Sequence, residues 1–542
     1  MIRPLAANVL AVSLLLSACT ALPPSRPSSW SAPEVLVPPS SFTGVHGLAV
    51  DKQGRLLAGS VVGSSLWEVN RQTGAARVLV PAPEGQADDI AVGPKGELAW
   101  TNYMIGVVRY REYDTAPMRV LAKDLPGINS LDFDRRNGKL YASQVFLGDA
   151  LWEIDVAGQT APRLIKKDLG GFNGFEVGPD GMLYGPLWFK GQVVKINPAN
   201  GDISVINSEF KTPAAANLDG KGHLWVIDTQ TGELCRVDLA TGRKTVVKQL
   251  KPALDNLAIA PDGTIYVSNM ADNSIEAFNP ATGALTLLTG GKVAVPAGMK
   301  VEGNDLWVAD IFGFRHVNTQ TGSVKDIFRM QASDMEYPFA VGVSSTHFAL
   351  TSWFTGTVQM VDRRTLKTSA ILHGLKAPFD AIPMADGSVV FAEIATGSIT
   401  RASGAQWADK KVIAQGLAGP VQMVLGQDGA LYVTLAAGQL VRVNLADGSK
   451  TTVAEGLALP EGLAQTPWGS FIVAESAAKR LVEIDPANGS RRTVAENLPI
   501  GMPGGVGMPP PYVVTGVAVG ADGSIFMSAD LNNAIYRIRP QR

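Results

Sequence analysis

Five polar residues in the first half of the chain occupy equivalent places in a repeated pattern: His46, Asp88, Asn129, Asn173 and Asp255. Each stands at the start of a short apolar stretch, as in "NGFEVG" and "DNLAIA". If the fold brings them together, their carboxylate and amide oxygens suit a hard cation such as Ca²⁺. An imidazole beside a carboxylate can also transfer protons. The alternative interpretation is a water-filled channel lined by solvated polar groups.

The elements that would position these residues come from an internal repeat. Turn glycines recur every 41–43 residues at Gly54, Gly96, Gly138, Gly181, Gly222 and Gly263, and the series resumes at Gly387, Gly429, Gly469 and Gly523. Two further copies without that glycine lie in the gap, which brings the total to twelve. Each copy holds four short strand candidates joined by turns such as "GPDG" and "NPANG". Four antiparallel strands at this period are typical of a propeller blade.

Twelve blades exceed the usual number for a single ring, which is about four to eight. We therefore predict an all-β chain of two tandem six-bladed β-propellers of four-stranded antiparallel blades, over residues 33–281 and 282–542. The final repeat stops after its third strand, "AIYRIRP", and a spare outer-strand candidate, "PEVLVPP", precedes the first repeat. We expect Val35–Val37 to complete blade six and "ALTLL" at 284–288 to close blade twelve. A seven-plus-five division would leave one ring unclosed in this way.

Two positions in each blade should converge on one mouth of the channel: the residue that opens the repeat and the end of the second strand. The openings of the second ring are mostly Ala, Phe and Val, which would leave a cation poorly compensated. We therefore predict that the first ring holds any divalent cation, with Asn129, Asn173 and Asp255 as ligands and Asp88 as the fourth. An acidic group in the second ring, Glu461 with Glu393 and Glu475, is the alternative cation site.

Catalytic and substrate-binding candidates follow from the same geometry. Blades one and six adjoin on closure, so His46 is expected beside Asp255, where the pair would transfer protons or serve as a structural pair. Substrate-binding candidates are the second-strand ends Asn102, Asp228 and Asn269, together with Trp188. The pairs Trp188-Phe189 and Trp353-Phe354 would line a pocket for an apolar substrate or cap the blades.

The openings "HGL", "NGF" and "DNL" at residues 46–48, 173–175 and 255–257 resemble those of the six-bladed superfamily of gluconolactonase, senescence marker protein, paraoxonase and strictosidine synthase. The resemblance implies a catalytic Ca²⁺ bound by Asn-Gly and Asp-Asn openings and a candidate base at His46. The first ring departs from the family because no opening is Glu and the fifth is Ala214. The repeat texture also resembles that of streptogramin lyase.

Composition excludes several other functions. The chain is 46% hydrophobic and 18% charged with net charge −2, so it lacks the basic excess of a nucleic-acid binder. The sequence contains no G-x-S-x-G elbow, P-loop, EF-hand loop or zinc-type Cys/His cluster.

The N-terminal segment "MIRPLAANVLAVSLLLSAC" resembles a bacterial lipoprotein signal, in which Cys19 becomes the lipidated first residue. An ordinary secretory signal is the alternative. Residues 19–32 form a Pro/Ser-rich tether. Because Thr20 rather than Asp follows, we expect an outer-membrane anchor facing the periplasm. With Cys19 acylated, Cys235 has no partner for an intramolecular disulfide.

Two functions are compatible with these features. The first, which we favour, is a metal-assisted hydrolase of lactones or small esters in the first ring. The second is a non-catalytic, lipid-tethered scaffold that binds a protein, peptide or glycan in the cell envelope.

Overall fold

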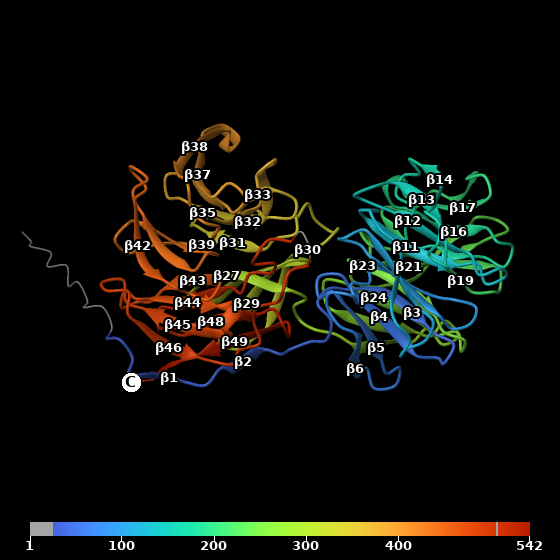
Figure 1. Ribbon diagram of the computed structural model, residues 1–542, viewed down its shortest axis with the longest axis horizontal. Coiled ribbons are helices and arrows are strands. Elements are labelled where there is room, and N and C mark those ends of the chain that lie inside the picture. The colour runs from blue at the N-terminus through green and yellow to red at the C-terminus, as the bar shows by residue number, and fades with distance from the viewer. Residues whose placement is uncertain (1–24, 506–507, 542) are drawn as a thin grey trace, which may run out of the picture.

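The computed structural model describes residues 25–505 and 508–541, so Cys19 and the signal segment lie outside the described residues. The described chain forms twelve four-stranded sheets and one two-stranded sheet. Three short 3-10 helices, η1 (Trp188–Lys190), η2 (Ala405–Trp407) and η3 (Ser476–Ala478), interrupt it. Figure 1 shows two rings of blades, the first coloured blue to green and the second yellow to red. The prediction of two six-bladed propellers is confirmed.

The first propeller takes its blades in chain order, each with the inner strand first. They are β3 (Val45–Val50), β4 (Leu56–Ser60), β5 (Ser65–Val69), β6 (Ala76–Val80); β7 (Ile90–Val92), β8 (Leu98–Asn102), β9 (Val107–Arg111), β10 (Arg119–Ala122); β11 (Ile128–Phe133), β12 (Leu140–Gln144), β13 (Ala150–Ile154), β14 (Arg163–Lys167); β15 (Glu176–Val177), β16 (Leu183–Leu187), β17 (Gln192–Ile196), β18 (Ile203–Asn207); β19 (Pro213–Leu218), β20 (His223–Asp228), β21 (Glu233–Asp238), β22 (Lys244–Gln249); β23 (Leu254–Ile259), β24 (Ile265–Asn269), β25 (Ser274–Phe278) and β26 (Leu285–Thr289). The inner strands β23 and β3 pack together and close the ring.

The second propeller repeats this order through five complete blades and a sixth that borrows one strand. They are β27 (Pro296–Glu302), β28 (Asp305–Asp310), β29 (Gly313–Asn318), β30 (Val324–Arg329); β31 (Ala340–Val343), β32 (His347–Ser352), β33 (Thr357–Asp362), β34 (Lys367–Leu372); β35 (Pro378–Pro383), β36 (Val389–Glu393), β37 (Ser398–Ser403), β38 (Asp409–Ala414); β39 (Pro420–Leu425), β40 (Leu431–Leu435), β41 (Gln439–Val443), β42 (Lys450–Glu455); β43 (Pro460–Gln465), β44 (Phe471–Glu475), β45 (Arg480–Ile484), β46 (Arg491–Ala495); β47 (Val517–Val519), β48 (Ile525–Ala529), β49 (Ala534–Ile538) and β2 (Glu34–Val37). Here β27 packs against β47.

The predicted assignment of the two closing strands was wrong. The N-terminal strand β2 pairs with β49 and completes the last blade, whereas β26 pairs with β25 and completes blade six. A second N-terminal strand, β1 (Ser29–Trp30), pairs with the C-terminal β50 (Pro540–Gln541). In Figure 1 this blue segment follows the red blades before it enters the first ring. The first propeller is therefore inserted between β2 and the rest of the second.

Buried ionic and apolar contacts join the two propellers. Arg329 at the end of β30 donates to Asp272 (2.9 Å) and to Asn269 (3.0 Å), both in blade six of the first propeller. An apolar cluster spans the junction and combines Met270 and Ala271 with Ile311 and other residues of the second propeller. These contacts fix the two rings against each other, so a cavity between them has fixed walls.

The strand pattern explains why each ring is stable without helices. The second strand of a blade, as in β4 or β16, is buried at every residue, and the outer strands are partly exposed. In the described residues, no helix is long and apolar enough to cross a membrane.

Candidate functional site

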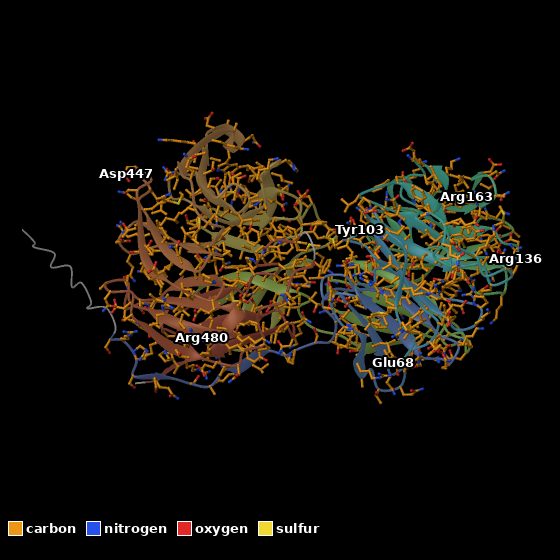
Figure 2. The ribbon with its side chains drawn as sticks, in the orientation of Figure 1. Glu68, Tyr103, Arg136, Arg163, Asp447 and Arg480 are labelled. Carbon is orange, nitrogen blue, oxygen red and sulfur yellow. The ribbon has the colours of Figure 1, made fainter. Side chains whose placement is uncertain are left out.

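A cavity of about 430 Å³ lies where the mouth of the first propeller meets the second propeller. Figure 2 labels Tyr103, one of its lining residues, at the junction of the two rings. The first propeller contributes all five polar openings predicted from the sequence: His46, Asp88, Asn129, Asn173 and Asp255. The second contributes aromatic side chains: Phe312, Tyr337, Phe339, Trp353, Phe354 and Tyr512. The cavity thus has a polar end and an aromatic end.

β-Bulges aim several of the polar residues at the cavity. The register between the first two strands shifts between Val45 and Leu48 in blade one, and between Ile128 and Ser130 in blade three. Blade six has the same irregularity between Leu254 and Leu257. A bulge leaves an extra residue outside the ladder and redirects its side chain, which is why His46, Asn129 and Asp255 face the channel mouth.

The glycines that follow two of the openings allow neighbouring inner strands to approach. A Cβ on Gly47 would lie 2.5 Å from the Asp88 carbonyl oxygen, and one on Gly174 would lie 2.4 Å from Ala215 Cα. Such distances are too short for any larger residue. The His-Gly and Asn-Gly pairs therefore combine a cavity-facing side chain with a position where only glycine fits.

The hydrogen bond of His46 determines which ring nitrogen is free. His46 Nδ1 lies 2.8 Å from the carbonyl oxygen of Gly44. Because a carbonyl only accepts, Nδ1 carries the proton, and Nε2 of the neutral ring keeps its lone pair. The ring is buried and packs edge-on against Phe312 at a centroid distance of 5.5 Å. His46 therefore lines the cavity with Nδ1 engaged, which leaves Nε2 as the nitrogen that can exchange a proton.

Asp88 and Asp255 form an electrostatically coupled pair of acids. Burial raises the pKa of Asp88 well above its ordinary value, and the charges of Asp255 and Asp89 raise it further, against the opposing effect of the Asn129 amide. Burial also raises the pKa of Asp255, while nearby His46 lowers it. The predicted neighbourhood of His46 and Asp255 is thus present. Ionisation of one of these carboxyl groups therefore disfavours ionisation of the other.

Asn129 and Asn173, two of the predicted calcium ligands, share one hydrogen-bond partner. Ser130 Oγ lies 2.9 Å from Asn129 Oδ1 and 2.8 Å from Asn173 Oδ1, and the Gly174 N–H donates to Asn173 Oδ1 at 3.0 Å. Ser130 has a single hydroxyl proton, so it donates to one of these two amide oxygens at a time. The described residues contain no group of three or more His, Cys, Asp or Glu side chains arranged to hold a metal, a group that does not include asparagine. The four predicted ligands line one cavity, and the calcium site stays a prediction.

Three predicted substrate-binding residues lie outside the cavity lining. Asn102 Nδ2 is within hydrogen-bond distance of the Pro83 and Glu84 carbonyls, and Asn269 Nδ2 donates to the Lys251 and Pro252 carbonyls. Asp228 accepts from the N–H groups of Lys211 and Thr212 at 2.7 and 3.0 Å. Each ties the end of a second strand to the loop that enters the same blade.

This bond recurs in both propellers. Asp310 accepts from Ala294, Glu475 accepts from Ala458, and Asp530 accepts from Gly501. The same residue types, Asp and Asn, thus have two different roles, and their position in the blade decides which. Residues that open a repeat face the cavity, whereas residues at the end of a second strand hold the entering loop.

Trp188 does line the cavity, where it packs edge-on against Phe146 at 5.3 Å. The predicted aromatic pair Trp353-Phe354 reaches the same space from the second propeller. Sequence reasoning missed Tyr103, Tyr337 and Tyr512. Their only signal was their location in loops, with Tyr512 directly after the Gly/Pro-rich stretch 501–511.

The mouth of the second ring is closed by its own openings. Phe379 and Val421 pack with Val514 in an apolar cluster against Trp353. The second ring therefore supplies an apolar wall to the cavity.

Replacing Asp88 by Asn is expected to stabilise the protein. The folded state holds a proton on this pair that the unfolded chain releases above pH about 4, so wild-type stability falls as pH rises from there toward the raised pKa. The variant loses this penalty and should melt about 2 °C or more higher at pH 8 than wild type, with a smaller gain at pH 4. Scanning calorimetry measures both.

The matched control is Asp262→Asn. Asp262 has a lowered pKa because it accepts the Thr264 N–H and pairs with Arg71, so its loss should not raise the melting temperature. An Asp88→Asn protein that melts below wild type at pH 8 would contradict the interpretation that burial of the Asp88 carboxyl group destabilises the fold at that pH.

Comparisons with known proteins add little about identity. No family model matches the chain, and no curated protein matches it. Among solved structures, virginiamycin B lyase from Staphylococcus aureus matches with 15% identity and a TM-score of 0.27, over 60% of this chain and 94% of that one. A streptogramin B lyase structure matches with 16% identity and a TM-score of 0.26, over 60% and 93%.

Proposed function

We propose that the protein is a hydrolase of small apolar esters or lactones and that the reaction takes place in the cavity between the propellers. The observation that carries the proposal is His46, whose Nδ1 is bonded to the Gly44 carbonyl so that Nε2 is left to exchange protons, near the buried acids Asp88 and Asp255. A base and a protonated acid at one site are what acyl transfer to water requires. The resemblance of the openings to those of the gluconolactonase and paraoxonase superfamily agrees with this class of reaction.

The proposed reaction uses side chains of this chain throughout. His46 Nε2 accepts a proton from water as the water oxygen attacks the carbonyl carbon. The Asp255 carboxylate stabilises the resulting imidazolium, and the NH₂ group of Asn173 donates to the carbonyl oxygen as it gains charge. The carbon–oxygen bond to the leaving group then breaks, and protonated Asp88 donates its proton to the alkoxide. The imidazolium proton returns to Asp88 through solvent, so one water is consumed for each acid and alcohol released.

If Ca²⁺ is bound, Asn129, Asn173, Asp255 and Asp88 would hold it, and it would polarise the substrate carbonyl. The cellular setting is part of the proposal: a lipid on Cys19 would hold the hydrolase at the outer membrane, facing the periplasm. This rests on the signal-like sequence alone.

The pH dependence of hydrolysis tests the proposal. Wild type should hydrolyse phenyl acetate or a δ-lactone with a bell-shaped profile, because the base must be neutral and Asp88 must be protonated. Activity should fall as pH rises through the raised pKa of Asp88. Asp88→Asn should lower kcat by about 10²–10⁴-fold and remove the alkaline limb.

Asp386→Asn, at an exposed turn of the second propeller, is the control and should keep both limbs. Failure of wild type to hydrolyse any ester or lactone, or full activity in Asp88→Asn, would overturn the hydrolase and favour a binding scaffold.

A further inference from the structure

The aromatic end of the cavity consists of rings set nearly at right angles. Phe312 meets Tyr337 at 73°, Tyr337 meets Phe354 at 78°, and Phe354 meets Trp353 at 85°. The centroid distances are 6.3, 5.6 and 6.0 Å. Edge-to-face contact is a preferred packing of aromatic side chains, and all four of these residues also line the cavity. We call these four residues the aromatic box.

The box is held rigidly by the second propeller. Trp353 Nε1 donates to the Tyr512 carbonyl at 3.1 Å, and its ring packs on Phe339 at 5.1 Å. Trp353, Phe354 and Tyr337 keep part of their surface accessible, in contrast to the fully enclosed rings of the blade cores. Their faces are therefore available to a ligand in the cavity.

The charge around the box is negative. Asp88 and Asp255 line the same cavity, and its described lining contains no Lys or Arg. Tyr337 connects the two ends: burial raises the pKa of its hydroxyl, and the negative charges of Asp255 and Asp88 raise it further. An anionic ligand would be repelled here. A neutral ligand would gain only from apolar burial, whereas a cation would also be attracted to ring faces and to the Asp255 carboxylate.

We propose that the aromatic box binds an alkylammonium group, so that the ligand of the cavity is a small ester or amine-bearing molecule with a tertiary or quaternary nitrogen. The claim that the substrate carries an alkylammonium group rests on the proposed hydrolase. The claim that the box binds such a group does not depend on the hydrolase. The cavity of about 430 Å³ lies within the range of small-molecule sites, roughly 300–1,000 Å³. The ammonium would lie among the rings, which leaves the ester at the polar end near His46.

Binding of a charged probe and its uncharged isostere tests the box. The full chain is titrated calorimetrically with choline and with 3,3-dimethyl-1-butanol, which has the same shape without the charge. Choline should bind at least about tenfold more tightly. Phe354→Leu, which keeps bulk but removes a ring face, should weaken choline binding by about 2- to 30-fold and leave the alcohol unchanged.

Two matched variants guard against a loss of folding. Tyr113→Leu removes a ring that is 59% exposed and lies outside the cavity lining, and it should bind choline as wild type does. Phe189→Leu removes an exposed ring of the first propeller that does not line the cavity, and it should also bind normally. Equal affinity for choline and the alcohol, absence of choline binding, or unchanged binding in Phe354→Leu would each overturn the inference.

The hydrolase and the box can fail separately. If acetylcholine and 3,3-dimethylbutyl acetate are hydrolysed with equal kcat/KM, the box has no role in substrate choice and the inference falls while the hydrolase stands. If choline binds as expected but neither ester is hydrolysed, the box is supported and the hydrolase is not.

Discussion

Val37→Asp is expected to open the second propeller while the first stays folded. Val37 is fully buried in β2, where it packs in an apolar cluster with Leu36 and Ile535. A carboxylate at this position would lie in an apolar interior, which costs several kcal/mol. The outer strand of the last blade should then detach, and the edge of β49 would lose its partner.

Limited proteolysis followed by mass spectrometry measures this effect. The variant should yield a resistant fragment that covers β3 to β26, with the second propeller digested. Val35→Asp is the matched control, since this neighbouring side chain is 53% exposed on the same strand, and it should be as resistant as wild type. Digestion of the first propeller before the second in Val37→Asp would contradict the pairing of β2 with β49.

His46→Ala is expected to lower kcat/KM for ester hydrolysis by about 10²–10⁴-fold, the usual contribution of a general base. The variant removes the only imidazole that lines the described cavity. His46→Gln, which fills more of the space, should be equally inactive and should melt close to wild type. Added imidazole should partly restore turnover in His46→Ala, because a small base can enter the emptied site.

The control for this experiment is His223→Ala. His223 pairs with Asp219 at a partly buried turn outside the cavity lining, so its loss should leave hydrolysis unchanged. A purely structural His46 would predict instead that activity follows melting temperature across the three variants, with no rescue by imidazole.

The closing strands show why a repeat pattern predicts blades better than it predicts connections. The segments Val35–Val37 and Leu285–Thr289 both have the alternation of an outer strand. The pattern alone therefore does not decide which of them completes blade six and which completes the last blade. Chain connectivity decides: β26 follows β25 through the tight turn at Thr282-Gly283, and a local hairpin costs less loop entropy than a distant pairing. The blade left without a fourth strand is then the last one.

The sequence predicted those site residues whose positions are set by the blade backbone. His46 and Asp255 share the opening position of adjacent blades, and blade geometry brings them together. The engagement of Asn129 and Asn173 depends on the Ser130 hydroxyl, a side-chain detail without a periodic signal. The aromatic wall comes from the other propeller, so its position depends on how the two rings dock through contacts such as Arg329 with Asp272.

The pairing of β2 with β49 means that the last blade can be completed only at the end of synthesis. Val35 pairs with Tyr536, so its strand leaves the ribosome about 500 residues ahead of its partner. At roughly 5–20 residues per second, that interval is about 25–100 s. During this time the first propeller can complete itself, while Val35, Leu36 and Val37 remain an unpaired apolar strand. The last blade, and with it the second propeller, therefore cannot close until synthesis has reached β49.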